Sequence, residues 1–149
     1  MRPNVRRATI DDLPAVVALQ RAAYAKNRAI LGVEPLPLLA NYAAIFSDYE
    51  VYLAERDGEL EGVLILEPRA DDLLIWSVAT APAVQGRGIG NTMLEFAEGR
   101  ARELGHACMR LYTGEPLTGN IAWYRRYGYA HERTEDLGDR RIVHLIKQL

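Results

Sequence analysis

The stretch with the clearest chemical potential is Gln85-Gly86-Arg87-Gly88-Ile89-Gly90, which places three glycines within five residues. Glycine has no Cβ, so the backbone there can take positive φ and approach a ligand closely. Apolar residues recur at helical spacing after Gly90, and the first N–H groups of a helix lack internal partners and carry a partial positive charge. With the added charge of Arg87, the pattern favours binding of a phosphate or pyrophosphate. The alternative is a glycine-rich turn that serves tight packing alone.

A strand is expected immediately before this loop. The run Leu73–Ala79 is continuously apolar apart from Ser77 and long enough for a buried strand, and Pro82 ends any extension of its hydrogen-bond ladder. The glycines therefore lie where a central strand becomes a helix.

The remaining elements surround this strand-loop-helix unit. Asp11 is expected to cap a first helix that has Pro14 in its first turn, and Asp57-Gly58 predicts a hairpin between two antiparallel strands. The other expected strands are Asn4–Ala8, Glu50–Arg56, Leu60–Glu67, His106–Thr113, Tyr129–Glu135 and Arg141–Leu149, and the other expected helices are Leu38–Phe46 and Asn120–Tyr127. This mixture predicts one α/β (α+β) domain over residues 1–149, built on a mixed sheet.

Composition limits the partners. The net charge of −2 and the interspersed signs argue against a nucleic-acid groove. The single cysteine, Cys108, has no partner for an internal disulfide, which fits a reducing compartment. No signal-peptide region or membrane-spanning apolar run is present, so we expect a cytoplasmic protein without a membrane partner.

Two motifs resemble those of the GCN5-related N-acetyltransferases (GNAT), which use acetyl-coenzyme A. The family pattern Gln/Arg-x-x-Gly-x-Gly/Ala is met by Gln85, Gly88 and Gly90. A second pattern, an Asn followed by Ala, a Leu/Trp-Tyr pair and Gly-Phe/Tyr, is met by residues 120–129. The resemblance implies a mostly antiparallel sheet with one splayed parallel strand pair, flanked by about four helices.

The same resemblance implies a cofactor site. The pyrophosphate of coenzyme A would lie on the N–H groups of residues 85–90, and the pantetheine would pair with the backbone of Ser77, Val78 and Ala79. The N–H of Val78 would polarise the thioester carbonyl, and Asn120 would reach the cofactor from the opposite wall. The full set of expected cofactor contacts is Ser77, Val78, Ala79, Gln85, Gly86, Arg87, Gly88, Ile89, Gly90, Asn120 and Tyr124.

For catalysis, the resemblance implies that Tyr124 is the general acid for the departing thiolate, although a tyrosine is often half-buried for packing alone. A base should deprotonate the acceptor amine, but residues 73–79 contain no acid, unlike some relatives. Glu67 is the best substitute, with Tyr112 and Glu115 behind it. The three histidines show no short metal-ligand spacing, so no metal is expected.

The function expected is transfer of an acetyl group from acetyl-coenzyme A to a primary amine of a small molecule or a protein, by direct attack in a ternary complex. The alternative is a catalytically silent acyl-coenzyme A sensor of the same fold, which would need neither Tyr124 nor a base. In relatives, the loop between the first two helices and the final hairpin recognise the acceptor; here these are residues 26–37 and 134–141. The final hairpin also allows a homodimer.

Overall fold

The computed structural model describes residues 2–149, which form seven strands, five α-helices and two short 3₁₀ turns. In chain order the elements are β1 (Asn4–Arg7), a 3₁₀ turn (Ile10–Asp12), α1 (Leu13–Leu31), α2 (Leu36–Leu39), α3 (Tyr42–Asp48), β2 (Glu50–Arg56), β3 (Glu59–Pro68), β4 (Leu73–Thr80), a 3₁₀ turn (Pro82–Val84), α4 (Ile89–Glu103), β5 (Cys108–Gly114), α5 (Thr118–Arg126), β6 (Ala130–Asp136) and β7 (Arg141–Gln148). No helix in this described part is long and apolar enough to cross a membrane.

The strands form one sheet in the order β1-β2-β3-β4-β5-β7-β6. β4 and β5 run parallel, and the other neighbours in this order are antiparallel. This confirms the predicted mixed, mostly antiparallel sheet. The hairpin at Asp57-Gly58 is also confirmed, because both residues have positive φ, 52° and 78°, as a type I′ turn requires.

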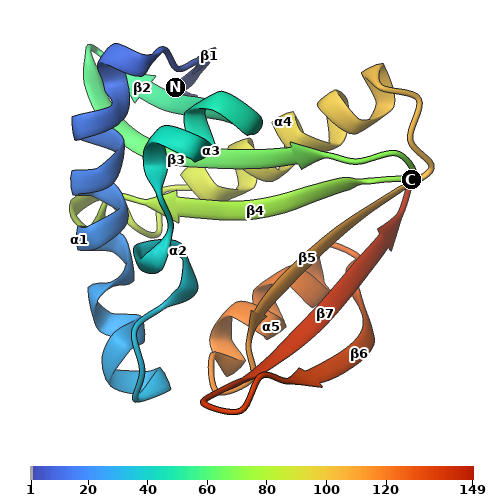
Figure 1. Cartoon of the computed structure of the whole chain (residues 1–149). Coiled ribbons are helices and arrows are strands. Elements are labelled where there is room, and N and C mark those ends of the chain that lie inside the picture. Colours follow the sequence, from blue (N-terminus) through green and yellow to red (C-terminus); the bar gives the residue numbers. More distant parts are fainter. Residues whose placement is uncertain (1) are drawn as a thin grey trace.

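The parallel pair separates after three residue pairs. β4 and β5 are in register only from Leu73↔Met109 to Ile75↔Leu111. On the other side of β4, Leu66 pairs with Ile75 and Ile65 with Ser77, so Trp76 is a bulge residue without a partner. Figure 1 shows the result: β5, β6 and β7 run away from β4, and the two halves of the sheet make a V whose open end faces α1.

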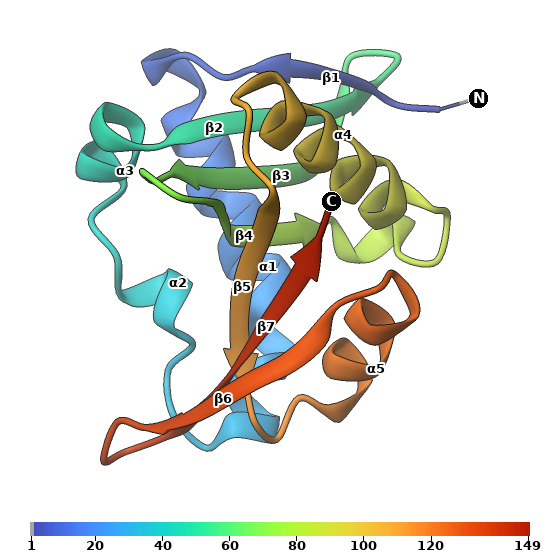
Figure 2. The same ribbon diagram turned by 90° about the vertical axis from the view of Figure 1, so that its right-hand side faces the viewer.

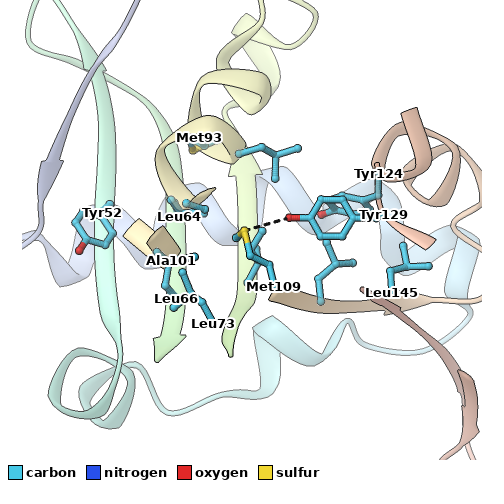
Figure 3. Packing of buried hydrophobic residues seen from close by; sticks show 14 of the residues in the cluster. Tyr52, Leu64, Leu66, Leu73, Met93, Ala101, Met109, Tyr124, Tyr129 and Leu145 are labelled. Carbon is cyan, nitrogen blue, oxygen red and sulfur yellow. Dashed lines mark hydrogen bonds between the residues drawn. The ribbon is translucent and has the colours of Figure 1, made fainter. Parts of the chain in front are cut away.

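Two apolar cores hold the helices on the sheet. On one face, α1 and α3 pack against β2, β3 and β4 through residues that include Val16, Leu19, Val51, Val63 and Ile65. On the other face, α4 and α5 pack through the residues shown in Figure 3, among them Met93, Met109 and Leu145. Figure 2 shows α4 and α1 on opposite sides of the strands. The helix that begins at the glycine loop is therefore held by a complete apolar face.

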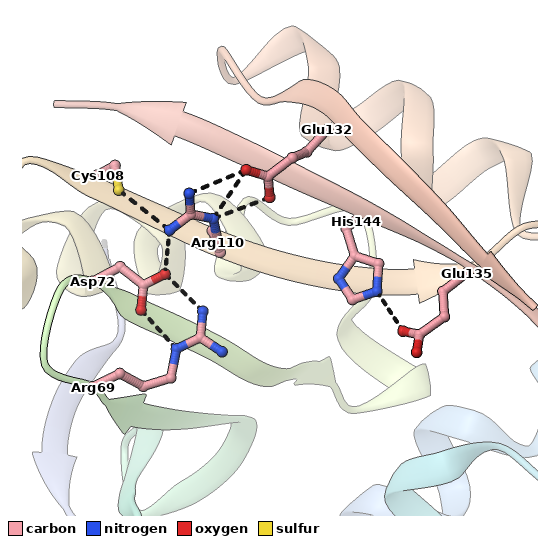
Figure 4. A network of polar contacts seen from close by, with 7 residues as sticks. All are labelled: Arg69, Asp72, Cys108, Arg110, Glu132, Glu135 and His144. Atoms are coloured by element: carbon pink, nitrogen blue, oxygen red, sulfur yellow. Dashed lines mark hydrogen bonds and ion pairs between the residues drawn. The ribbon is translucent and has the colours of Figure 1, made fainter. Parts of the chain in front are cut away.

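The closed end of the V is held by ion pairs around Asp72, whose side chain is 4% exposed. Asp72 accepts two hydrogen bonds from Arg69, both 2.6 Å, and one of 2.7 Å from Arg110 on β5. Arg110 also donates to Glu132 on β6 (Figure 4). These contacts join the turn before β4 to the strands of the other half of the sheet.

Two predictions about helices were wrong. The single helix expected over residues 38–46 is two helices, because Ala40 is extended and the side chain of Asn41 accepts from Ala44 N–H to cap α3. The cap expected at Asp11 is instead provided around Thr9 and Asp12. Thr9 N–H donates to the Asp12 carboxylate at 2.8 Å, and Arg6 fixes the same carboxylate at 3.0 Å.

Candidate functional site

A cavity of about 710 Å³ occupies the open end of the V between β4 and β5. Its size lies within the usual range for small-molecule and cofactor sites, about 300–1,000 Å³. Ten predicted site residues line it: Ser77, Val78, Ala79, Gln85, Gly86, Gly88, Ile89, Gly90, Asn120 and Tyr124. The fold thus brings the glycine loop, the central strand and α5 together around one space, and leaves two predicted residues, Arg87 and Glu67, out of its lining.

The glycine loop has the backbone geometry that an anion site needs. Gly86 and Gly88 have φ values of 83° and 81°, which L-residues with side chains rarely adopt. Gly88 is the N-cap of α4. Among residues 2–149, the first N–H of this helix with a backbone acceptor is that of Thr92, bonded to the Gly88 carbonyl at 3.1 Å. The preceding N–H groups are therefore available to a ligand at the positive end of the helix dipole.

The side chains around the loop differ from the expectation in one respect. Arg87 is exposed and does not line the cavity. Lys26 of α1 lines the cavity instead and donates to Gln85 Oε1 at 3.1 Å, and Arg126 of α5 lines it as well. The positive charge at this end of the cavity thus comes from two helices in addition to the loop.

Gly90 requires its small size for packing. A Cβ there would lie 2.9 Å from Cζ2 of Trp123, whose Nε1 donates to Asn91 Oδ1 at 3.2 Å. Trp123 therefore docks α5 on the first turn of α4. This contact sets where Asn120 and Tyr124, on the same helix, meet the cavity.

The edge of β4 that faces the cavity is free beyond Ile75, because its pairing with β5 stops there. In a strand, alternate N–H and C=O groups point to each edge, so this segment offers unpaired backbone groups to an extended ligand. The side chain of Ser77 is buried and turned toward α1. Its Oγ accepts from Gln20 Nε2 at 3.0 Å and lies 2.8 Å from the Tyr24 hydroxyl.

Tyr124 is 8% exposed, and its ring packs against those of Trp123 and Tyr129 at centroid distances of 4.9 and 5.9 Å. Burial raises the pKa of its hydroxyl well above the usual value, and the nearby Tyr24 and Tyr129 add to the effect. Tyr124 is therefore protonated at neutral pH. No hydrogen bond from the described side chains contributes to this shift, and the residue lines the cavity, so its hydroxyl is free to bind a ligand.

Glu67 is half-buried on β3 and pairs with Leu74 near the start of β4, at the closed end of the V. The pKa of Tyr49 is raised mainly by the burial of its hydroxyl, and the negative charge of Glu67 adds to this shift. It also contributes to the raised pKa of Tyr112, which follows mainly from burial. Tyr112 itself lines the cavity, whereas Glu115 is paired with Arg141 at 3.1 Å. Glu67 is therefore close enough to Tyr112 to influence its pKa but does not itself line the cavity.

The sequence reasoning missed several lining residues. Tyr24 is the most important of them: burial raises its pKa to about 12, and its hydroxyl bonds Ser77. Its helical spacing predicted a core position on α1, and no local signal distinguishes a core tyrosine from one whose hydroxyl reaches a cavity. Tyr127 also lines the cavity, as do Asn27, Arg140 and Arg141, which lie in the two segments expected to recognise the acceptor. No cluster of three or more metal-ligating side chains occurs in residues 2–149.

The sequence of the chain is similar to a known protein family and to an acetyltransferase. A family model described as Acetyltransferase (GNAT) family matches residues 14–129. An amino-acid acetyltransferase of Ralstonia nicotianae (strain ATCC BAA-1114 / GMI1000) is 29% identical over 139 residues, or 92% of the chain. The chain spans only 28% of the length of that protein.

Solved structures share the fold at low identity. The PaiA N-acetyltransferase of Thermoplasma acidophilum, in complex with coenzyme A, superposes with a TM-score of 0.80 at 21% identity over the full length of both chains. A GNAT family acetyltransferase of Elizabethkingia anophelis with acetyl-CoA bound gives 0.76 at 19% identity, covering 99% of each chain. The ribosomal-protein-S18-alanine N-acetyltransferase of Escherichia coli gives 0.80 at 17% identity, covering 97% of the chain and 92% of its own.

Proposed function

The chain belongs to the GNAT acetyltransferase family, and from this premise we propose that it transfers the acetyl group of acetyl-coenzyme A directly to an amine in a ternary complex. The observation that carries the proposal is the cavity itself, which joins a helix N-terminus with free N–H groups, an open strand edge and a protonated tyrosine. An acyl thioester of coenzyme A needs three contacts: an anion site for its pyrophosphate, an extended strand edge for its pantetheine and a hydrogen-bond donor for its departing sulfur.

The residues of the loop fit the pyrophosphate. The N–H groups between Gln85 and Gly90 would hold it, with Lys26 and Arg126 supplying charge from the flanking helices. The pantetheine would lie along the free edge of residues 77–79, as an added partial strand. Acetyl-coenzyme A supplies the activated thioester, and the Val78 N–H is proposed to polarise its carbonyl.

Tyr124 is proposed to assist the departing thiolate. A thiol has an ordinary pKa near 8.5, below that of tyrosine, so complete proton transfer from a tyrosine with a raised pKa is unfavourable. The role that fits is a hydrogen bond donated to the sulfur as negative charge develops on it. Loss of one such donor to a developing negative charge costs about 10²–10³ in rate.

The acceptor amine must lose a proton before or during attack. Asp and Glu side chains are absent from the described cavity lining, so a direct carboxylate base is not part of this proposal. The proton is proposed to leave through water past Tyr112, with Glu67 behind that residue as the carboxylate that accepts it. Glu67→Gln should then lower the rate most at low pH, where the amine is most fully protonated.

Thermal shift with acetyl-coenzyme A tests the cofactor site without knowledge of the acceptor. A ligand at 100 times its dissociation constant stabilises a fold by about 2.7 kcal/mol, so wild type should show a clear rise in Tm. Gly88→Ala forces a side chain onto a residue with φ of 81° and should weaken the response. Gly58→Ala is the matched control, because Gly58 has φ of 78°, open space for a Cβ and no place in the cavity.

The expected result is an equal loss of basal stability in both variants and loss of the acetyl-coenzyme A response in Gly88→Ala alone. No response of wild type at millimolar acetyl-coenzyme A would refute the proposal. A full response without thiol release for any amine would leave the silent acyl-coenzyme A sensor as the better description.

A further inference from the structure

The charges on the cavity wall are all of one sign. Lys26, Arg126, Arg140 and Arg141 line it, and no Asp or Glu does so within the described residues. The whole chain has 20 acidic and 18 basic residues, so composition does not explain this segregation. The space is therefore built for anionic ligands.

Two of these cations belong to the cofactor end. Lys26 donates a hydrogen bond to Gln85 of the glycine loop. Trp123 is docked on the first turn of α4, and Arg126 lies one helical turn after Trp123 on α5. The phosphates of coenzyme A would account for both.

The other two cations belong to a different end. Arg140 and Arg141 lie at the β6–β7 turn, and Arg140 Nη1 donates to the carbonyl of Glu34, in the loop between α1 and α2, at 2.7 Å. In Figure 1 this turn lies at the tip of the β5–β7 arm of the V, whereas the start of α4 lies at the tip of the other arm, beside the end of β4. Phosphates bound at the glycine loop do not account for arginines placed here.

Arg140 is built into the wall rather than lying loosely on it. Its side chain is 10% exposed, and three of its five N–H donors are used: Nε and Nη2 bind Asp139, and Nη1 binds Glu34. One N–H remains on each of Nη1 and Nη2. Arg141, 52% exposed, pairs with Glu115 at 3.1 Å and Asp136 at 3.7 Å. These carboxylates lie outside the cavity lining, so they reduce the positive electrostatic potential of the cavity without occupying it.

We propose, on the basis of the acetyl transfer proposed above, that the acceptor is a small amine that also carries a carboxylate, held by Arg140 and Arg141 with its amine toward β4. Guanidinium groups bind carboxylates with paired hydrogen bonds, which would fix the position of the amine. A polyamine would place additional positive charge against a cationic wall and is disfavoured by it.

The closure of this end favours a small acceptor over a protein. Arg28 holds the Glu34 carboxylate with two hydrogen bonds of 3.0 and 2.8 Å, while Arg140 holds the Glu34 backbone. The α1–α2 loop and the β6–β7 turn are thus joined across the acceptor end, which narrows the space for an extended peptide.

The test compares matched acceptors in a thiol-release assay with saturating acetyl-coenzyme A. Each of a set of L-amino acids is measured beside its own α-carboxamide, which keeps the amine and the side chain but removes the carboxylate charge, and spermidine is included. Wild type should prefer amino acids over their carboxamides and over spermidine by at least tenfold in kcat/KM. Arg140→Gln and Arg141→Gln should remove most of this preference by raising KM for the amino acids, and Arg140→Lys should restore part of it.

Arg133→Gln is the control, because Arg133 belongs to the same hairpin, is 57% exposed and does not line the cavity. It should keep the wild-type preference. Equal or better use of carboxamides or spermidine by wild type would overturn the inference while leaving acetyl transfer intact. Failure of every amino acid to release thiol would also overturn it. An acetyl-coenzyme A thermal shift in the same preparations shows separately whether the cofactor proposal has failed.

Discussion

Removal of the Tyr124 hydroxyl is the perturbation that best separates catalysis from packing. In Tyr124→Phe the ring contacts with Trp123 and Tyr129 remain, and no hydrogen bond to a described side chain is lost. A buried hydroxyl without a partner costs free energy, so its removal should change the free energy of unfolding by less than about 1 kcal/mol, in either direction. Acetyl-coenzyme A binding should be nearly unchanged.

The catalytic effect should be much larger. If the hydroxyl donates a hydrogen bond to the departing sulfur, kcat should fall by about 10²–10³, which corresponds to about 2.7–4 kcal/mol of lost transition-state stabilisation. The assay is thiol release with the best acceptor of the amino-acid panel, together with urea unfolding and the acetyl-coenzyme A thermal shift on the same protein.

Tyr127→Phe is the matched control, since Tyr127 is the residue that follows α5, packs against Trp123 and also lines the cavity. It should retain kcat within a few-fold. Equal activity of Tyr124→Phe and wild type would refute the proposed role of the hydroxyl. A parallel fall of stability and activity would show that the hydroxyl is structural.

Four further results are expected. Gly90→Ala should lose about 1–3 kcal/mol of stability and also activity, because its Cβ would displace Trp123 and with it α5; calorimetry and thiol release check this. Gly99→Ala, with open space inside α4, should gain about 0.5–1 kcal/mol in urea unfolding. Leu64→Ala should lose about 2–5 kcal/mol, because the side chain is fully buried between the sheet and α4. Arg69 and Arg110 hold the pKa of Asp72 below its unfolded value of 3.8. The stabilisation of the fold by the ionised Asp72 is therefore complete above pH 3.8 and is lost as the pH falls through the folded pKa. Asp72→Asn should lose about 2 kcal/mol of stability at neutral pH, and its Tm should depend less on acid pH than that of wild type.

Much of the architecture could be predicted because local signals and tertiary structure agree. Leu73–Ala79 is a buried run ended by Pro82, and the strand observed there extends by one residue to Thr80. Glycine allows positive φ in the loop that follows, and Gly86 and Gly88 both adopt it. Seven strands were expected and seven are found, near the predicted positions.

The errors arise where a tertiary contact decides between local alternatives. Asp11 and Asp12 are equal as caps by residue type, but only Asp12 is also held by Arg6 of β1. Leu38–Phe46 has helical composition throughout, yet the Asn41 side chain caps a new helix and ends the first one. Residues 134–141 were predicted to contribute to acceptor recognition, but this segment carries charges of both signs. Only the fold shows that Arg140 and Arg141 line the cavity while the neighbouring acidic residues do not.

The width of the cavity depends on the bulge in β4, which belongs to the cavity lining, and on an ion-pair cluster that lies outside the lining. β5 pairs with β4 only as far as Ile75, because the bulge at Trp76 interrupts the regular backbone spacing of β4 and bends the rest of that strand away from β5. At the other end of the pair, Asp72 binds Arg110 of β5, which in turn binds Glu132 of β6, so the angle of the V is fixed by ion pairs that touch no ligand (Figure 4). Loosening this cluster would move Tyr112 and α5 relative to the Ser77–Ala79 edge. Asp72→Asn should therefore raise KM for the acceptor more than it weakens acetyl-coenzyme A binding at the glycine loop, which α4 holds through its own apolar face.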